Sequence, residues 1–210
     1  ADYSAMPIDV LDVKDVAQLS TGADQSCVLL KAGTVKCWGY DAYGGLGNGE
    51  YDNRGLTAVD VKNLDHVTQV TVGGFFACAL LESGQVKCWG RNNFAQITPN
   101  DEHNHALPML VAGVEGVVQV ESFSYTTCAV LKTGKVTCWG DGNYGDLGNG
   151  TSPTMSAPVE VWGISAVKSI SNRCVLPESG APICWGENYG DKLNVGTGKN
   201  ILSPTPMGGF

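Results

Sequence analysis

Eight cysteines are the residues of this sequence whose spacing points most directly to chemistry, because they fall into pairs with nine residues between the two members. Zinc sites usually place cysteines about two to four residues apart, so this spacing favours disulfides, with zinc binding as the competing interpretation. Disulfides imply an oxidising compartment: secreted, periplasmic or cell-surface. The pairs are Cys27-Cys37, Cys78-Cys88, Cys128-Cys138 and Cys174-Cys184.

The residues between the cysteines predict a β-hairpin that brings each pair together. A three-residue hairpin loop places its last residue in the left-handed region, where glycine carries no steric penalty. With residues 31–33 as the loop and Gly33 as its last residue, counting back along both strands sets Cys27 opposite Cys37. Directly opposed residues of antiparallel strands are close enough for a disulfide, and the same counting applies to the other three pairs.

Other reactive groups give no coherent catalytic site. The sequence contains no nucleophile elbow, no HExxH motif and no phosphate-binding glycine loop, and paired cysteines leave no thiol nucleophile. Asp101, His103 and His105 are residue types that bind metals, but they are more typical here of a solvated polar loop. Residues 141–146 resemble a calcium loop but lack its bidentate glutamate. We therefore expect no enzyme, no cofactor and no metal.

Composition excludes several function classes. The 210 residues are 43% hydrophobic and 16% charged, which is typical of a globular protein, and the net charge of −8 argues against binding to nucleic acid or anionic membranes. No apolar run is long enough for a transmembrane helix, so no membrane insertion is expected. The first ten residues lack the charged-then-apolar pattern of a signal peptide, so any leader is expected to be absent from this chain.

Four internal repeats of about 50 residues fill the chain. Each repeat reads as a β-branched strand, the cysteine hairpin, a glycine-rich loop and a proline-led strand, which is the content of one β-propeller blade. The 28 glycines agree with many tight turns between short strands. We expect one all-β propeller domain over residues 1–210, with blades near 11–61, 62–111, 112–161 and 162–210, and residues 7–10 as a possible closing strand.

The motif C-A-L-x-x-x-G-x-V-x-C-W-G, followed by N-x-x-G-x-L-G-N-G, resembles the repeat of the regulator-of-chromosome-condensation type propellers. The best matches to the second part are residues 39–49 and 140–150, and the cysteine pair is similar to the bacterial secreted branch. That family usually closes with seven blades, whereas this chain has four repeats. We favour a four-bladed ring closed by residues 7–10; an excised piece, or identical chains that complete each other, are the alternatives.

Residues that break the repeat are the candidates for binding, because variable loops on a repeated scaffold usually carry specificity. The tryptophan after each second cysteine is expected to pack between blades, whereas Tyr43, Phe94, Tyr144 and Tyr189 follow nearly in register and could line one face. Phe75, Phe76 and Tyr125 could form an aromatic platform or simply plug the channel. The candidate ligand-binding residues, all expected on one propeller face except the isolated Trp162, are Asp24, Gln25, Tyr40, Phe75, Phe76, Arg91, Tyr125, Asp141, Trp162 and Glu187.

These features together favour a non-enzymatic recognition or adhesion module of a secreted or cell-surface protein, which binds a glycan or a protein on another surface. A structural or oligomerisation module of a larger extracellular assembly, homo-oligomeric or part of a fibre-like chain, is the second class. A secreted protein inhibitor is the third, because the resemblance includes bacterial inhibitors of β-lactamase.

Overall fold

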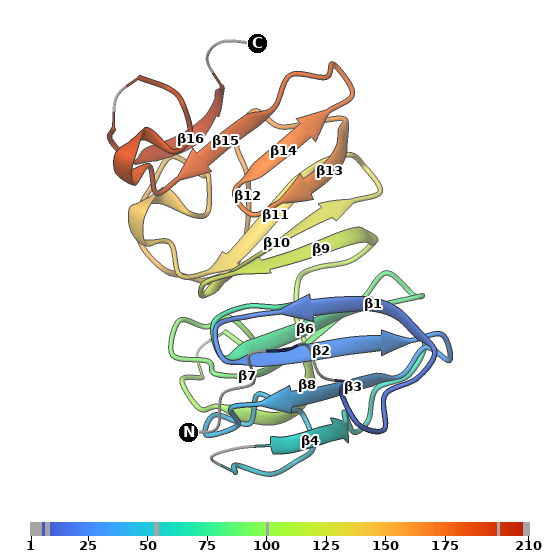
Figure 1. The fold of residues 1–210 in the computed structure, drawn as a ribbon. Helices are drawn as coiled ribbons and strands as arrows, with labels where there is room; N and C mark the ends of the chain where they lie inside the picture. Colours follow the sequence, from blue (N-terminus) through green and yellow to red (C-terminus); the bar gives the residue numbers. More distant parts are fainter. Residues whose placement is uncertain (1–5, 7–8, 53–54, 100, 197, 208–210) are drawn as a thin grey trace.

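The computed structural model describes residues 6, 9–52, 55–99, 101–196 and 198–207, and in them four antiparallel four-stranded sheets follow one another along the chain (Figure 1). We call these sheets blades 1 to 4. Blade 1 contains β1 (Val16–Thr21), β2 (Gln25–Leu30), β3 (Val35–Gly39) and β4 (Gly55–Asp60); blade 2 contains β5 (Val67–Val72), β6 (Phe76–Leu81), β7 (Val86–Gly90) and β8 (His105–Leu110). Blade 3 contains β9 (Val117–Phe123), β10 (Thr126–Leu131), β11 (Val136–Gly140) and β12 (Met155–Glu160); blade 4 contains β13 (Val167–Ser171), β14 (Cys174–Pro177), β15 (Ile183–Gly186) and β16 (Ile201–Pro206).

Helical structure in the described residues is limited to two short 3₁₀ turns, η1 (Asn143–Gly145) and η2 (Tyr189–Asp191). Neither has the length or the hydrophobicity that a membrane-spanning helix needs. The predicted all-β propeller architecture is therefore confirmed.

The central hairpin of each blade has the predicted register. Gly33 adopts φ +78°, its N–H donates to the carbonyl of Leu30 at 2.9 Å, and the N–H of Leu30 donates to Thr34 at 2.9 Å. A side chain at Gly33 would be strained by this left-handed conformation. The turn sets Cys27 opposite Cys37 in the β2–β3 ladder, as the sequence predicts.

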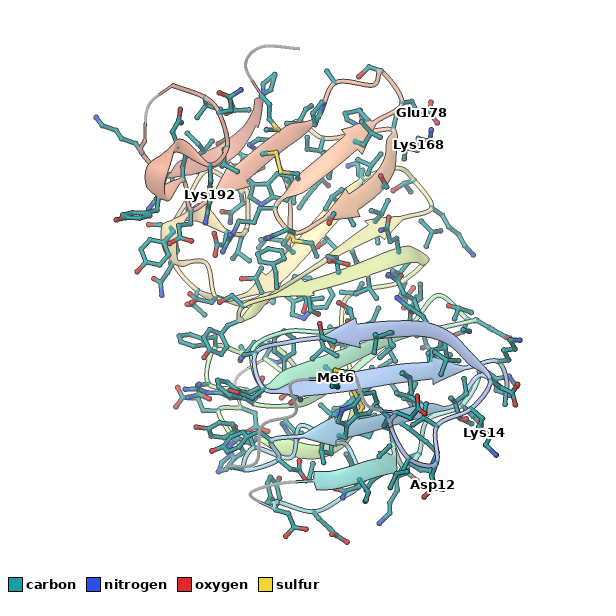
Figure 2. The ribbon with its side chains drawn as sticks, viewed as in Figure 1. Met6, Asp12, Lys14, Lys168, Glu178 and Lys192 are labelled. Atoms are coloured by element: carbon teal, nitrogen blue, oxygen red, sulfur yellow. A yellow bond between two sulfur atoms is a disulfide. The ribbon has the colours of Figure 1, made fainter. Side chains whose placement is uncertain are left out.

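All four predicted disulfides are present, one in each blade, with Cα–Cα distances of 4.0 to 4.1 Å (Figure 2). Such short separations are typical of opposed residues at a non-hydrogen-bonded position of an antiparallel pair. No described cysteine is free, so the zinc interpretation is excluded for these residues. Each bridge fastens the two middle strands of a blade.

Three apolar clusters hold successive blades together, one for each pair of neighbours. A fully buried tryptophan stands in each cluster, and its indole Nε1 donates to a loop carbonyl of the preceding blade at 2.9 Å. The pairs are Trp89 with Gly45, Trp139 with Gln96, and Trp185 with Asp146. These three tryptophans therefore pack between blades as predicted, because only there is the ring buried while its N–H finds an acceptor.

A second contact repeats between blades along their innermost strands, β1, β5, β9 and β13. The side chain of Gln69 in β5 donates to the carbonyl of Val120 in β9 at 2.8 Å and accepts from the Val120 N–H at 2.9 Å. Gln119 makes the same two bonds to Ile170 in β13, and Gln18 accepts from the N–H of Val70. We call this series the glutamine ladder. It satisfies backbone groups that an edge strand would otherwise leave unpaired.

The four blades form an arc, and blades 1 and 4 lie at its two ends (Figure 1). Leu19 of β1 is 58% exposed, whereas its counterpart Val70 in β5 is fully buried. No apolar cluster of the described residues joins blade 4 to blade 1. Asp9 and Val10 lie outside every strand, and Pro7 and Ile8 lie outside the described residues. The expected closure of the ring by residues 7–10 is therefore not shown.

Replacement of Gln69 by alanine should lower the free energy of unfolding by about 1 to 3 kcal/mol, because it leaves the buried N–H and carbonyl of Val120 without partners. Chemical denaturation of the oxidised protein measures the change. Gln85→Ala, in an exposed turn, is the control and should alter stability by less than about 0.5 kcal/mol. Equal effects of the two substitutions would argue against a stabilising role for the ladder.

Reduction should release eight thiols and destabilise the protein, since each disulfide closes a short loop worth roughly 2.8 kcal/mol in the chain-entropy model. Mass spectrometry after alkylation, with and without reductant, counts the thiols. Alkylation of the unreduced, denatured protein would show that the pairs do not form.

Candidate functional site

The predicted binding loops lie at one end of the blades, where the first and third strands of each sheet end and the second begins. For blade 1 this is the left edge in Figure 1, where the arrowheads of β1 and β3 point. The same backbone bond fixes the loops in successive blades: the N–H of Tyr40 donates to Asp24, that of Arg91 to Phe75, and that of Asp141 to Tyr125, at 2.8 to 3.0 Å. Each bond holds the residue after the Trp-Gly pair beside the loop that joins the first and second strands of the same blade.

Five aromatic rings from three blades meet around one arginine at this end. Phe75 contacts Tyr40, Tyr43 and Tyr125 with ring centroids 5.8, 5.5 and 6.4 Å apart. All six side chains are partly buried, so each keeps some surface open to solvent. We call the group the aromatic cluster; it consists of Tyr40, Tyr43, Phe75, Arg91, Phe94 and Tyr125.

The guanidinium of Arg91 lies among the rings of the cluster. Its Cζ is 5.0 Å from the centroid of Tyr43, 5.8 Å from that of Phe75 and 5.1 Å from that of Tyr125. Nη1 donates to the Tyr125 hydroxyl at 3.1 Å, and Nε donates to the side chain of Asn93 at 2.7 Å. Among the described residues no carboxylate forms an ion pair with it. Since a guanidinium has five N–H donors, Arg91 retains donors for a ligand.

The backbone at Phe75 is unusual for a bulky residue. Phe75 adopts φ +79° in the tight turn in which the N–H of Gly73 donates to the carbonyl of Phe76 at 2.9 Å. An aromatic residue in the left-handed region costs conformational energy, which the neighbouring contacts must offset. The turn places the Phe75 ring in the cluster, while Phe76 points into the core.

The structure brings together four of the predicted residues: Tyr40, Phe75, Arg91 and Tyr125. Two other candidates, Gln25 and Phe76, are buried, so their side chains are not open to a surface ligand. Successive side chains of a β-strand point to opposite faces. Gln25 and Phe76 are the first residues of β2 and β6, and their side chains point inward, away from the loop end.

The side chains of the remaining predicted residues lie apart from the aromatic cluster; Asp24 and Asp141 contact it only through backbone hydrogen bonds with Tyr40 and Tyr125. Asp24 is exposed, Asp141 accepts from the N–H of Asn143 at 2.9 Å, and Trp162 is exposed beside Gly150. Glu187 pairs with Lys192 at 2.7 Å, and this bond holds the pKa of the carboxyl below its ordinary value.

Tyr43 and Phe94 were not among the candidate binding residues, although their register after the tryptophans was noted. That register alone does not select them, because Tyr144 and Tyr189 share it and are exposed, Tyr189 to 85%. The difference is the neighbouring blade. Phe75 and Tyr125 supply rings beside Tyr43 and Phe94, and blade 4 has Asn172 and Arg173 at the same loop position.

The polar loop at residues 101–105 does not gather into a metal site. Asp101 pairs with His103 at 2.6 Å and with His105 at 3.2 Å. Within the described ranges no group of three or more histidine, cysteine or acidic side chains is placed to hold a metal ion. Asp146, from the calcium-like stretch, is instead buried in an ion pair with Arg173 at 2.7 Å.

Asp41 supports the loop that carries Tyr43. Its Oδ1 accepts from the N–H of Leu46 at 2.9 Å, and the residue is fully buried. Burial raises the pKa of this carboxyl from 3.8 to about 6, against the lowering effect of its backbone hydrogen bonds. Asn92 and Asn188 occupy the same position in blades 2 and 4, where an amide supplies both a donor and an acceptor.

Comparison with known proteins agrees with this geometry. The family described as the regulator of chromosome condensation (RCC1) repeat matches residues 16–44, 67–96 and 117–146. These ranges cover the first three strands of blades 1, 2 and 3 and all six residues of the aromatic cluster. They do not include blade 4.

Two curated proteins illustrate the relatives. The rat (Rattus norvegicus) probable E3 ubiquitin-protein ligase HERC4 is 34% identical over 110 residues, which is 50% of this chain and 10% of HERC4. The Arabidopsis thaliana ultraviolet-B receptor UVR8 is 27% identical over 116 residues, 54% of this chain and 26% of UVR8. The chain thus spans a small part of the length of these relatives.

Solved structures share the fold. Human WBSCR16 superposes with a TM-score of 0.80 at 22% identity, over 91% of this chain and 52% of that protein. Prp20p of Saccharomyces cerevisiae gives a TM-score of 0.82 at 18% identity, over 95% and 52%. The arc of four blades therefore corresponds to about half of each larger structure.

Asp41 should make stability depend on pH. The folded protein retains a proton that the unfolded chain releases, so the free energy of unfolding should fall as pH rises from about 4 to about 6. Asp41→Asn should remove this fall and be more stable at pH 7 by at least about 1 kcal/mol. Chemical denaturation at several pH values from 4 to 7 measures this pH dependence of stability. Asp65→Asn, at an exposed carboxylate, is the control and should keep the wild-type pH dependence. Loss of the pH dependence in this control would contradict the assignment to Asp41.

Proposed function

Because the chain belongs to the regulator-of-chromosome-condensation (RCC1) repeat family, we propose that it is a recognition module without chemistry of its own, which binds a partner protein through the aromatic cluster. The observation that carries the proposal is the convergence of five rings and Arg91 from three blades on one end of the propeller. The blades supply a rigid frame, and the variable loop residues supply the contacts.

The composition of the cluster supports a protein ligand. Tyrosine and arginine are enriched among the residues that carry most of the binding energy at protein interfaces, and they act best when clustered and partly desolvated. Arg91 meets this description, since it stacks against Tyr43 and Tyr125 and keeps unused donors. Among solved structures of the same fold, Prp20p is described with binding properties to Gsp1p and histones.

The four disulfides support an oxidising compartment as the setting of this binding. Secretion or display at a cell surface, where the module would meet partners on another surface, follows as part of the proposal. The acidic net charge of −8 favours a partner that is neutral or basic overall, with Arg91 contacting one local carboxylate or carbonyl.

Glycan binding is the second candidate. The rings of Phe75 and Tyr125 lie 6.4 Å apart at an interplanar angle of 26°, so they offer two nearly parallel faces. Rings so arranged present apolar faces on which a sugar could stack, with Arg91 beside them to hydrogen-bond its hydroxyl or carboxylate groups.

Two substitutions test the site. Phe75→Ala/Tyr125→Ala and, separately, Arg91→Gln should each weaken binding of the ligand by about 30-fold or more, the effect of losing a dominant contact residue. The measurement is quantitative capture by the immobilised protein from an envelope-protein extract, in parallel with a glycan array. Ligands retained by the wild-type protein and lost from both variants identify the class of partner.

Tyr189→Ala is the matched control, because Tyr189 is an exposed tyrosine at the same loop end on blade 4, outside the aromatic cluster. It should bind like the wild-type protein. If the cluster variants retain every ligand that the wild-type protein captures, the assignment of binding to this face is wrong. Circular dichroism and thiol counts confirm that each variant keeps its fold.

A further inference from the structure

The innermost strands repeat a second hydrogen bond beside the glutamine ladder. Two residues after the ladder glutamine, a side-chain oxygen accepts from a backbone N–H of the next blade. In blades 1 and 2 the acceptor is a hydroxyl: Ser20 accepts from Val72 at 3.0 Å, and Thr71 accepts from Ser122 at 2.8 Å. In blade 3 the residue at this position is Glu121, and its carboxyl accepts from the N–H of Asn172. Blade 3 therefore has a carboxyl group where a hydroxyl makes the same bond in blades 1 and 2.

Glu121 can accept more hydrogen bonds than this one. An ionised carboxylate has about four lone-pair sites, and the N–H of Asn172 occupies one of them. Among the described residues no ion pair includes Glu121. The side chain is partly buried, and this burial raises the pKa of the Glu121 carboxyl, against the lowering effect of the Asn172 N–H. Since burial disfavours the charged form, a cation beside Glu121 would stabilise the carboxylate.

Glu121 lines a cavity of about 390 Å³ at the loop end of the four innermost strands. Ligand-binding cavities usually measure about 300 to 1,000 Å³, so this one has room for a small group. Val72 and Phe123 supply apolar surface, and Ser122 and Ser124 supply hydroxyl groups. No lysine, arginine or histidine is found among the described residues that line it. With one acidic side chain and no basic one, the lining favours a cationic ligand.

The cavity adjoins the aromatic cluster. Gly74 and Ser124 line the cavity, and the cluster residues Phe75 and Tyr125 follow them directly in the sequence. The two loops are in contact, because the N–H of Gly74 donates to the carbonyl of Ser124. A Cβ on Gly74 would lie 3.3 Å from the ring of Tyr125. A protein docked on the aromatic cluster would therefore lie beside the cavity.

We propose that this cavity receives a basic side chain, lysine or arginine, of the partner protein and pairs its charge with the carboxylate of Glu121. The inference rests on the proposed function for the source of the cation. The aliphatic part of such a side chain packs against Val72 and Phe123, while its charged end donates to Glu121 and to the serine hydroxyls. The net charge of −8 attracts a basic partner to the same surface.

The repeat itself supplies the test substitution. Glu121→Thr removes the charge and introduces the hydroxyl with which Thr71 makes the same bond in blade 2, so the N–H of Asn172 keeps a partner and the fold should be retained. Asp24→Asn is the matched control, because it removes one exposed carboxylate at the same loop end, outside the lining of the cavity. Circular dichroism and chemical denaturation check that both variants fold.

The experiment is an NMR titration of the oxidised full chain with the N-acetyl, N-methylamide derivatives of lysine and arginine, and with that of norleucine as the uncharged control. At least one charged probe should produce saturable shifts at the backbone N–H groups of Gly74, Ser124 and Asn172. Glu121→Thr should weaken this binding by about 10-fold or more, the effect of losing a hydrogen bond to a charged group, and Asp24→Asn by less than about 2-fold. No saturable shift up to about 100 mM, equal binding of the norleucine probe, or equal losses in the two variants would overturn the proposal.

A second measurement separates the cavity from the aromatic cluster. Phe75→Ala/Tyr125→Ala should still bind the charged probe, because neither ring lines the cavity. In the capture assay Glu121→Thr should weaken retention of the partner protein by about 10-fold. A wild-type chain that binds the probe but captures no protein would refute the proposed function and leave the cation site in place. Capture that is unchanged in Glu121→Thr would refute the role of the cavity in partner binding.

Discussion

The structure depends on how the innermost strand of each blade satisfies its outward-facing backbone groups. These strands have a hydrogen-bonded neighbour on one side only, so buried N–H and carbonyl groups on the other side would destabilise the fold if unpaired. The glutamine ladder supplies the partners: Gln69 binds both groups of Val120, and Gln119 binds both groups of Ile170. Because each glutamine belongs to the preceding blade, the same bonds that satisfy one strand fix the position of the next blade.

This constraint separates the residues that build the propeller from those that can vary. The ladder, the disulfides and the buried tryptophans repeat from blade to blade, so they leave little freedom within the sheets. The loop residues at the strand ends vary instead: Asp24, Phe75 and Tyr125 occupy the same position in successive blades. The fixed spacing between blades brings the rings of Phe75 and Tyr125 within contact distance of Arg91.

Blade 4 departs from the pattern, and its contacts differ accordingly. The shorter loop before β14 carries Arg173, which pairs with the buried Asp146 of blade 3 instead of joining the aromatic cluster. Burial raises the pKa of Asp146, while the neighbouring Arg173 acts in the opposite direction and favours the ionised carboxylate. The loop face thus carries the aromatic cluster on blades 1 to 3 and the Asp146–Arg173 ion pair between blades 3 and 4.

The sequence alone determined the repeat, the four-stranded blades, the hairpin register and the disulfides, because each of these follows from local spacing: a glycine at a fixed place in a turn sets the strand pairing on both sides of it. It also identified Phe75, Arg91 and Tyr125 as residues that break the repeat. Only the tertiary structure decided which of these residues meet, since contact depends on the angle between blades and on the direction of each side chain. Gln25 and Phe76 differ from their neighbours in the direction of the side chain, and Tyr43 and Phe94 differ from Tyr144 and Tyr189 in the rings that the next blade places beside them. The arrangement of the four blades in an arc was also decided only by the tertiary structure, because it depends on how whole sheets pack against one another.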